Sequence, residues 1–254
     1  MNVIIGHTGL VGSALSKQLE FEYKFNRSNI NEFNTIPDDC NLFLSCLPAE
    51  KWKINQNITS DIDNMMSILD IIKNKKYSKV YLISTIDVYL DTELFSNEDT
   101  IPKIKKLGYG SNRYLFELLV KEYLKTDHLN IIRLPALFND GIKKNVLYDL
   151  LNNNSIDKIN SNSSYQWYNP NNLIDDIKTY CNQEEIVYNF FTEPLETEKI
   201  IELFPQHKNS VMWTDKRVIY DYKTKHNQTG YIKSKEKTFN EIQQFVENYE
   251  SSNK

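Results

Sequence analysis

The feature that most restricts the fold of this chain is a run of glycines directly after its first apolar segment. Residues 2–5 (NVII) are apolar and too short for a helix, whereas residues 10–19 have apolar side chains at helical spacing. Between them lies a turn whose residues are Gly6, Thr8, Gly9, Leu10, Val11 and Gly12. Glycines at this spacing allow a tight turn and close packing of helix on strand, and the helix N-terminus then faces an anion. The segment therefore predicts a strand, a turn and a helix that bind the pyrophosphate of a dinucleotide.

Strand-like and helix-like segments alternate through the first half of the chain. Further strands are expected at 23–26, 41–46, 80–84 and 129–134, and amphipathic helices at 58–73 and 111–124. This alternation predicts an α/β fold with a Rossmann-type, doubly wound parallel sheet.

The rhythm of the sequence changes after Pro135. We expect residues 1–135 to form a dinucleotide-binding domain, to which residues 171–191 return. Residues 136–170 and 192–254 are expected to form a small C-terminal substrate-binding lobe. Within this second half, 152–164 is expected to be mainly loop, with helices at 171–180, 196–204 and 238–249 and a strand at 185–191.

Composition narrows the class of function. The 254 residues carry a formal net charge of −4 without a basic block, which argues against nucleic acid as a partner. The first residues do not have the pattern of a signal peptide, and no apolar stretch approaches the roughly 18 residues of a membrane span. Three cysteines without metal-ligand spacing indicate no metal site and a reduced, cytoplasmic setting.

The end of the second expected strand bears on the choice of cofactor. A carboxylate at this position would bind the free 2′-hydroxyl of an adenosine ribose, but the sequence reads Asn26-Arg27-Ser28. Arg27 and Ser28 suit a 2′-phosphate, because a guanidinium binds phosphate with two parallel hydrogen bonds. We therefore expect NADP, with NAD as the second choice. Cys46 and Leu47, which follow the strand before the helix at 58–73, are also assigned to the cofactor site.

Two further motifs resemble those of one family. Residues 84–89 (STIDVY) are similar to the serine/threonine motif, and residues 109–113 (YGSNR) to the YxxxK motif, of extended short-chain dehydrogenases/reductases. Within that family the resemblance is to the NAD-dependent epimerase/dehydratase group that modifies sugar nucleotides. It implies a nicotinamide cofactor, a sugar substrate and a homodimer formed by the helices at 58–73 and 111–124.

The residue types fit proton transfer to a carbonyl oxygen. Tyr109 can act as the acid if a nearby cation lowers its pKa, and Arg113, four residues on, shares its helix face. Thr85, at a strand end, is expected to hydrogen-bond the same oxygen and so to contact substrate. Arginine in place of lysine is the main departure from the family, since a guanidinium cannot release a proton. Asp87 is either a base for epimerisation or a residue that caps the adjoining turn.

Expected substrate contacts in the second half rest on the resemblance. Lys144 and Asn145 follow the crossing into the lobe, and Gln166 and Trp167 occupy the segment that lies near the nucleotide in the family. Gln166 stands where many members have an arginine, which weakens the expectation of a diphosphate. Lys51 and Trp52 are expected on a loop at the mouth of the pocket.

Three functions remain open at this stage. The first is an NAD(P)-dependent oxidoreductase that reduces a keto group on a sugar, with a nucleotide-linked sugar as the first expectation. The second is a nucleotide-sugar epimerase with a tightly held cofactor. The third is a protein that binds NADP without catalysis.

Overall fold

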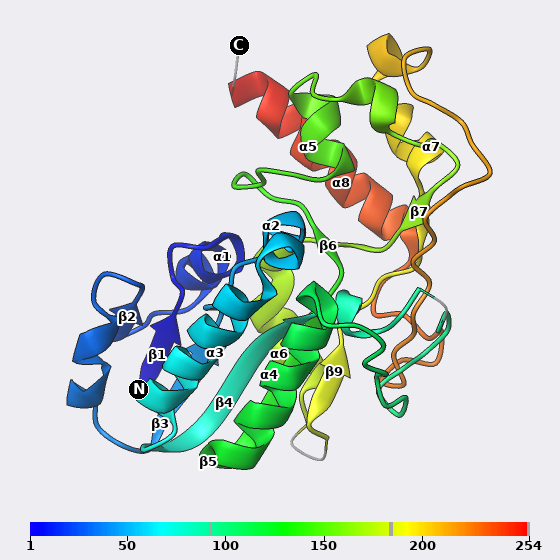
Figure 1. Ribbon diagram of the computed structural model, residues 1–254. Helices are drawn as coiled ribbons and strands as arrows, with labels where there is room; N and C mark the ends of the chain where they lie inside the picture. The colour runs from blue at the N-terminus through cyan, green and yellow to red at the C-terminus, as the bar shows by residue number, and fades with distance from the viewer. Residues whose placement is uncertain (92, 183–184, 253–254) are drawn as a thin grey trace. The chain divides into compact units, whose positions relative to one another are not determined.

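The computed structural model confirms the α/β architecture expected from the alternating segments, and it describes residues 1–91, 93–182 and 185–252 (Figure 1). The chain divides into two units. The first contains residues 1–90, 98–134 and 171–189, and the second contains residues 91–97, 135–170 and 190–254.

A six-stranded sheet forms the centre of the first unit. Its strands are β1 (Asn2–Ile5), β2 (Tyr23–Phe25), β3 (Cys40–Leu44), β4 (Lys76–Thr85), β5 (Lys125–Leu134) and β9 (Val187–Asn189). They run in the order β2-β1-β3-β4-β5-β9, and every neighbouring pair is parallel. The chain moves from β1 to β2 on one side and returns to β3 on the other. The crevice at the carboxyl ends of β1 and β3 is therefore the topological switch point, where sheets of this kind bind ligands.

Helices cover both faces of the sheet. They are α1 (Leu10–Gln18), α2 (Lys51–Gln56), α3 (Ile58–Ile72), α4 (Tyr109–Tyr123) and α6 (Leu173–Tyr180). Figure 1 shows α3 and α4 side by side over one face, and α1 contacts α6 on the other. The core on the α3 and α4 side includes Leu42 and Val80 of the strands, Met65 and Leu69 of α3, and Phe116 of α4. These apolar contacts at helical spacing hold the helices, because isolated helices of this length are marginal in water.

Several boundaries differ from those expected. β4 begins at Lys76 and β5 at Lys125, about four residues earlier than their apolar runs, because the two strands pair from Lys76 and Lys125 onward. Apart from the buried Tyr77, the first four residues of each strand are polar and at least partly exposed. Lys51 and Trp52 lie on a short helix, α2, and not on a loop.

The second unit has smaller sheets and its own core. Its strands are β6 (Ala136–Leu137), β7 (Ser164–Tyr165), β8 (Trp167–Tyr168) and β10 (Leu195–Glu196), and its helices are α5 (Val146–Leu151), α7 (Thr197–Ile201) and α8 (Lys235–Ser252). β6 pairs with β8 in parallel, and β10 pairs with β7 antiparallel. Short 3₁₀ turns of the two units are η1 (Ile30–Thr35), η2 (Ile86–Val88), η3 (Ile156–Lys158), η4 (Pro170–Asn172) and η5 (Pro205–His207). None of the helices in the described part of the chain has the length and hydrophobicity needed to cross a bilayer.

A buried polar cluster fixes α4 on the sheet. Arg133 of β5 donates from Nε to Glu117 Oε1 at 3.0 Å and from Nη2 to Glu117 Oε2 at 2.6 Å. Its Nη1 donates to the Tyr89 hydroxyl at 2.7 Å, and the Ser84 hydroxyl donates to Glu117 Oε1 at 2.5 Å. The side chains of the ion pair are only 3% and 2% exposed. Removal of one partner would leave an uncompensated charge in the interior.

We therefore expect Arg133→Met to lower the free energy of unfolding by about 3–5 kcal/mol, measured by urea denaturation. Arg217→Met, at an exposed position, serves as the control and is expected to change it by less than about 0.5 kcal/mol. The double variant Arg133→Met/Glu117→Leu is expected to recover part of the loss. A single variant as stable as the parent would contradict the role of this pair.

Candidate functional site

The glycine turn lies at the carboxyl end of β1, in the switch-point crevice. Gly6 has a φ of +95°, and a Cβ atom at this position would lie 2.1 Å from the Ser45 carbonyl oxygen. A Cβ on Gly12 would lie 2.0 Å from the carbonyl oxygen of Gly6. The turn is thus packed so tightly that only glycine fits at its first and third positions. Both positions are where the pyrophosphate-binding turn of a Rossmann fold requires glycine.

The start of α1 has the features of an anion site. Gly9 is the N-cap residue and has no side chain with which to satisfy the first N–H groups of the helix. Leu10 and Val11 begin the helix, and Thr8 and Gly9 are exposed. Unsatisfied N–H groups and the helix dipole together favour a phosphate at this point. The residues present therefore fit a dinucleotide.

The loop after β2 presents no carboxylate. Arg27 and Ser28 are exposed, and the Asn26 side chain accepts from the Ser28 N–H at 2.8 Å and from its hydroxyl at 2.6 Å. The His7 ring lies beside this strand end, with Nδ1 3.0 Å from the Phe25 carbonyl oxygen. Arg27 and Ser28 lie after β2 as the sequence predicted. The structure shows that the imidazole of His7 also lies at the end of this strand.

Cys46 and Leu47 follow β3, next to the glycine turn. Both are partly buried and pack against the core of the first unit. Burial raises the pKa of the Cys46 thiol to about 12, so the thiol is neutral at physiological pH. An uncharged lining at this strand end suits the ring and sugar parts of a dinucleotide better than its phosphates.

Thr85, Asp87 and Tyr109 come together at the carboxyl end of β4. Thr85 is the last residue of this strand, and its hydroxyl accepts from the Asp87 N–H at 3.2 Å. A Cβ on Gly110 would lie 1.8 Å from the Asp87 carbonyl oxygen, so the first turn of α4 packs directly on η2. Asn55 of α2 accepts from the Tyr109 N–H at 2.9 Å and fixes the start of α4.

The surroundings of Tyr109 act on its proton in opposite directions. Burial raises the pKa of Tyr109, and the Asp87 carboxylate raises it further. The charge of Arg113 and hydrogen bonding with Thr85 and Arg113 lower it. The balance of these effects is a raised pKa, so Tyr109 is protonated at neutral pH.

Arg113 lies under the Tyr109 ring but is held by a buried carboxylate. Its guanidinium carbon is 4.8 Å from the ring centroid of Tyr109. Nη1 donates to Asp61 Oδ2 at 2.9 Å, and Nη2 donates to Asp61 Oδ1 at 3.0 Å and to the Pro48 carbonyl oxygen at 2.7 Å. The Arg113 and Asp61 side chains are 5% and 2% exposed. A direct bond from Arg113 to a cofactor ribose would require this bidentate pair to be rearranged.

Asp61 is a residue of the site that sequence reasoning missed. It lies on α3, on the same buried face as Met65, Ile68 and Ile72. A carboxylate at helical spacing with buried apolar side chains needs a buried cation, and this was the available signal. The Asn112 side chain, next to Arg113, also donates to Asp61 Oδ2 at 2.8 Å.

Lys51 is the second cation of this region. Its Nζ lies 2.7 Å from Asp87 Oδ1, and the Lys51 and Asp87 side chains are 50% and 19% exposed. The sequence indicated Lys51 only as a residue near a pocket mouth. Its pairing with Asp87 joins α2 to the turn after β4.

The expected substrate residues Gln166 and Trp167 are in the interior of the second unit. The Gln166 amide donates to the carbonyl oxygens of Thr192 at 2.6 Å and Tyr222 at 2.9 Å, and its Oε1 accepts from the Tyr222 N–H at 2.9 Å. Trp167 is 1% exposed. These contacts give Gln166 a structural role as a cross-link between segments, and they do not support direct binding of substrate.

Lys144 and Asn145 precede α5. Lys144 is exposed, as a phosphate-binding side chain must be. Asn145 caps the helix, because its Oδ1 accepts from the Tyr148 N–H at 3.0 Å while its Nδ2 donates to the Leu137 carbonyl oxygen at 2.8 Å. These contacts give Asn145 a role in the fold, and a contact of Lys144 with substrate stays a prediction.

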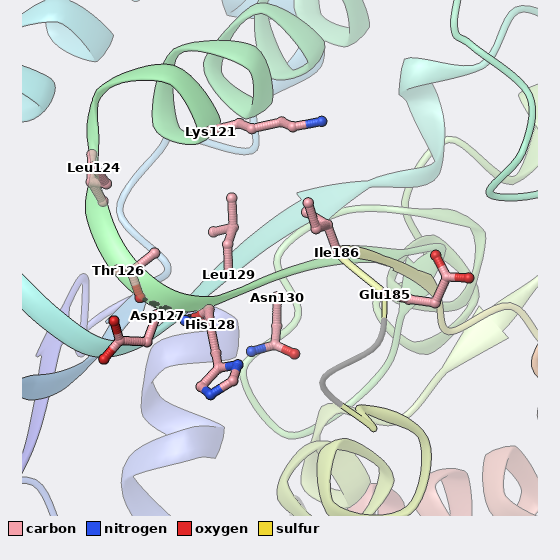
Figure 2. A pocket seen from close by; sticks show the side chains of 9 residues that line it. All are labelled: Lys121, Leu124, Thr126, Asp127, His128, Leu129, Asn130, Glu185 and Ile186. Atoms are coloured by element: carbon pink, nitrogen blue, oxygen red, sulfur yellow. Dashed lines mark hydrogen bonds between the residues drawn. The ribbon is translucent and has the colours of Figure 1, made fainter.

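A separate hollow of about 290 Å³ lies where β5 begins, beside the last turn of α4. Figure 2 shows Leu129 and Ile186 pointing toward the side of Lys121, whereas His128 and Asn130 point to the other side. It contains none of the expected site residues, and it lies away from the carboxyl ends of the strands. We do not assign the candidate site to this hollow.

Comparison with known proteins gives matches only at the level of structure. No family model matches the sequence, and no curated protein matches it. MoeE5 in complex with UDP-glucose and NAD is 10% identical, with a TM-score of 0.76 over 100% of this chain and 99% of that one. A dTDP-4-dehydrorhamnose reductase from Clostridium acetobutylicum is 14% identical, with a TM-score of 0.71 over 98% and 100%. A UDP-glucose 4-epimerase from Thermotoga maritima is 14% identical, with a TM-score of 0.70 over 100% of both chains. The chain therefore shares the fold of these proteins.

The packing of the glycine turn predicts different effects at two of its positions. Gly12→Ala is expected to lower the free energy of unfolding by about 1–3 kcal/mol, because its methyl group meets backbone that cannot move aside. At Gly9 a Cβ would be 3.4 Å from the nearest atom, so Gly9→Ala is expected to change it by less than about 1 kcal/mol. Urea denaturation of both variants measures the difference, and equal stabilities would contradict this packing.

Proposed function

We propose that this chain is an NADP-dependent oxidoreductase of the extended short-chain type that reduces a keto group on a nucleotide-linked sugar. The observation that carries this proposal is the meeting of Thr85, Tyr109 and Arg113 at the carboxyl end of β4, in the same unit as the glycine turn. A pyrophosphate site and a phenol beside a hydrogen-bonding hydroxyl are the two parts that carbonyl reduction needs.

In this proposal the first unit holds the cofactor. The N–H groups at the start of α1 bind the pyrophosphate, Arg27 and Ser28 bind the adenosine end, and Cys46 and Leu47 line the path between them. When bound, the nicotinamide supplies the hydride. The glycine turn supports this assignment, since Gly6 and Gly12 allow its tight packing and the exposed Gly9 leaves the start of α1 open to a phosphate.

Tyr109 is the proton donor in the proposed reaction. As the carbonyl carbon is reduced, the oxygen gains negative charge and takes the phenolic proton, while the Thr85 hydroxyl donates a hydrogen bond to it. Arg113 stabilises the phenolate that remains, through its position 4.8 Å from the ring. It does not pass on a proton, since a guanidinium stays charged.

The protonated state of Tyr109 is the form that carbonyl reduction requires. Epimerisation begins by oxidising the substrate, which requires a phenolate to accept a proton. Burial and Asp87 raise the pKa of Tyr109, so the protonated form is the one present at neutral pH. The protonated phenol is the form that donates a proton in the reductive step.

The names of similar structures guide the choice of substrate. One is a dTDP-4-dehydrorhamnose reductase, and others are described in complex with UDP-glucose or as UDP-sugar epimerases. We propose a nucleoside diphosphate sugar for this chain, with Lys144 facing its diphosphate. In this proposal, Gln166 and Trp167 stabilise the interior of the second unit and do not contact the sugar.

A homodimer built on α3 and α4 remains a prediction. Both helices carry large apolar side chains on their outer surfaces, with Met66 40%, Leu118 44% and Tyr123 52% exposed. Such side chains support pairing of these helices with a second copy of the chain.

Tyr109→Phe tests the reaction directly. We expect this variant to lose at least about 100-fold in turnover, because no other group replaces the proton donor. The assay follows NADPH consumption with dTDP-4-dehydrorhamnose and UDP-4-keto sugars as probes, and the dissociation constant for NADPH is expected to stay unchanged. Tyr123→Phe, on the same helix but 52% exposed, is the control.

Retained turnover in Tyr109→Phe would remove Tyr109 from the mechanism. Conversion of sugars without net consumption of NADPH would favour the epimerase, and binding of NADPH without turnover of any probe would favour a protein that does not catalyse.

The loop after β2 predicts cofactor preference. NADPH is expected to bind at least about tenfold more tightly than NADH, because the Arg27 guanidinium pairs with the 2′-phosphate and no carboxylate favours a free ribose. Arg27→Leu is expected to bring the two dissociation constants within about threefold. Fluorescence titration of both nucleotides measures them, and tighter binding of NADH by the parent protein would overturn the preference.

A further inference from the structure

Two charged side chains, Arg113 and Asp87, bear on the proposed acid Tyr109, and each of them is paired with a charge from another element. Arg113 is on its own helix, Asp61 on α3, Asp87 on η2 and Lys51 on α2. The four form two ion pairs, one buried and one partly exposed. The effect of each pair on the ionisation of the Tyr109 phenol depends on how rigidly the two side chains are held.

The buried pair has little freedom to respond to Tyr109. The guanidinium of Arg113 makes two bonds to Asp61 and one to the Pro48 carbonyl oxygen, at 2.7–3.0 Å. With both side chains almost fully buried, breaking this pair would leave a charge uncompensated. Arg113 is therefore a fixed cation whose charge is largely balanced by a carboxylate.

The pair of Lys51 and Asp87 is held less firmly than the pair of Arg113 and Asp61. Lys51 is the first residue of α2, its side chain is half exposed, and its single ammonium lies 2.7 Å from Asp87 Oδ1. Asp87 in turn is fixed by its backbone, which touches Thr85 through a hydrogen bond and Gly110 through close packing. The carboxylate that bears on Tyr109 thus has its own counter-ion on a neighbouring helix.

The position of α2 relative to α4 is also set. Asn55, one turn along α2 from Lys51, accepts the hydrogen bond from the Tyr109 N–H. The same short helix therefore carries both the cap of the catalytic turn and the cation that pairs with Asp87. Movement of α2 would alter the placement of Tyr109 and of the Lys51 charge together.

We propose that Lys51 is a positioning residue for proton transfer at Tyr109: it holds the Asp87 carboxylate, and through Asp87 it controls how readily the phenol gives up its proton. This inference rests on the proposed role of Tyr109 as the acid.

The charge of Asp87 determines whether loss of Lys51 makes Tyr109 a weaker or a stronger acid. An uncompensated Asp87 carboxylate disfavours a negative phenolate nearby, so loss of Lys51 makes Tyr109 a weaker acid. Loss of Asp87 makes it a stronger one. In a variant that lacks the Asp87 charge, the effect of Lys51 through that carboxylate is lost.

The test measures ionisation at position 109 without any substrate. Tyr109 is replaced by difluorotyrosine, whose phenol ionises at lower pH, and the fluorine NMR signal of the full-length protein is followed against pH. We expect Lys51→Met to move the midpoint upward by about half a pH unit, roughly a threefold change in the ionisation constant. Lys51→Arg is expected to keep the parent midpoint, and Asp87→Asn to lower it.

Two comparisons make the result specific. Lys53→Met removes the same charge from the same helix at a side chain that is 54% exposed and pairs with Glu50, and it is expected to leave the midpoint unchanged. In the Asp87→Asn background, Lys51→Met is expected to move the midpoint by less than a third of its effect in the parent. This double-mutant comparison isolates the path through Asp87.

An unchanged midpoint in Lys51→Met, or an equal shift with and without Asp87, would overturn the inference. A shift as large in Lys53→Met would do the same, since it would show only an effect of net charge. These outcomes are independent of the reductase proposal, which fails instead if NADPH is not consumed with any keto sugar or if Tyr109→Phe keeps its turnover.

Discussion

The buried ion pair between Asp61 and Arg113 is the constraint on which the candidate site depends. It joins α3 to α4, and through the Pro48 carbonyl oxygen it also holds the segment that follows β3. One turn further along α4, Glu117 pairs with Arg133 of β5. These two pairs fix the rotation and position of α4, because each is directional and costly to break when buried. The place of Tyr109 at the first turn of α4 follows from them.

In this arrangement, the fixed charge beside Tyr109 and the proposed adjustment of its phenol belong to different side chains. Arg113 supplies a fixed positive charge under the Tyr109 ring, and its partner Asp61 keeps it in place. Thr85 offers a hydroxyl at the end of β4. In our proposals, adjustment of the phenol falls to Asp87 and Lys51, whose pair is accessible to solvent. The buried ion pairs fix the position of α4, and the partly exposed pair of Lys51 and Asp87 adjusts the acidity of Tyr109 in our proposal.

Local patterns in the sequence predicted much of the first unit. The glycine turn, the alternation of strands and helices and the helix that begins near Tyr109 were all visible, because each depends on nearby residues. The pair of Asp61 and Arg113 joins residues 52 positions apart, so only the buried spacing of Asp61 hinted at it. The pairing of Lys51 with Asp87 required the position of α2, a helix too short to show a clear apolar period. In the second unit, Gln166 was predicted to contact substrate from the resemblance alone, and the backbone groups of Thr192 and Tyr222 that it binds are too far along the chain for the sequence to reveal them.

The most direct test of this account is a crystal structure of the protein with NADPH bound. We predict the pyrophosphate against the N–H groups between Gly6 and Gly12, the nicotinamide facing Thr85 and Tyr109, and Arg113 still paired with Asp61. A dinucleotide bound away from the glycine turn would contradict the proposed site. An Arg113 side chain that leaves Asp61 to bind the ribose would contradict the division of tasks between Arg113 and Lys51.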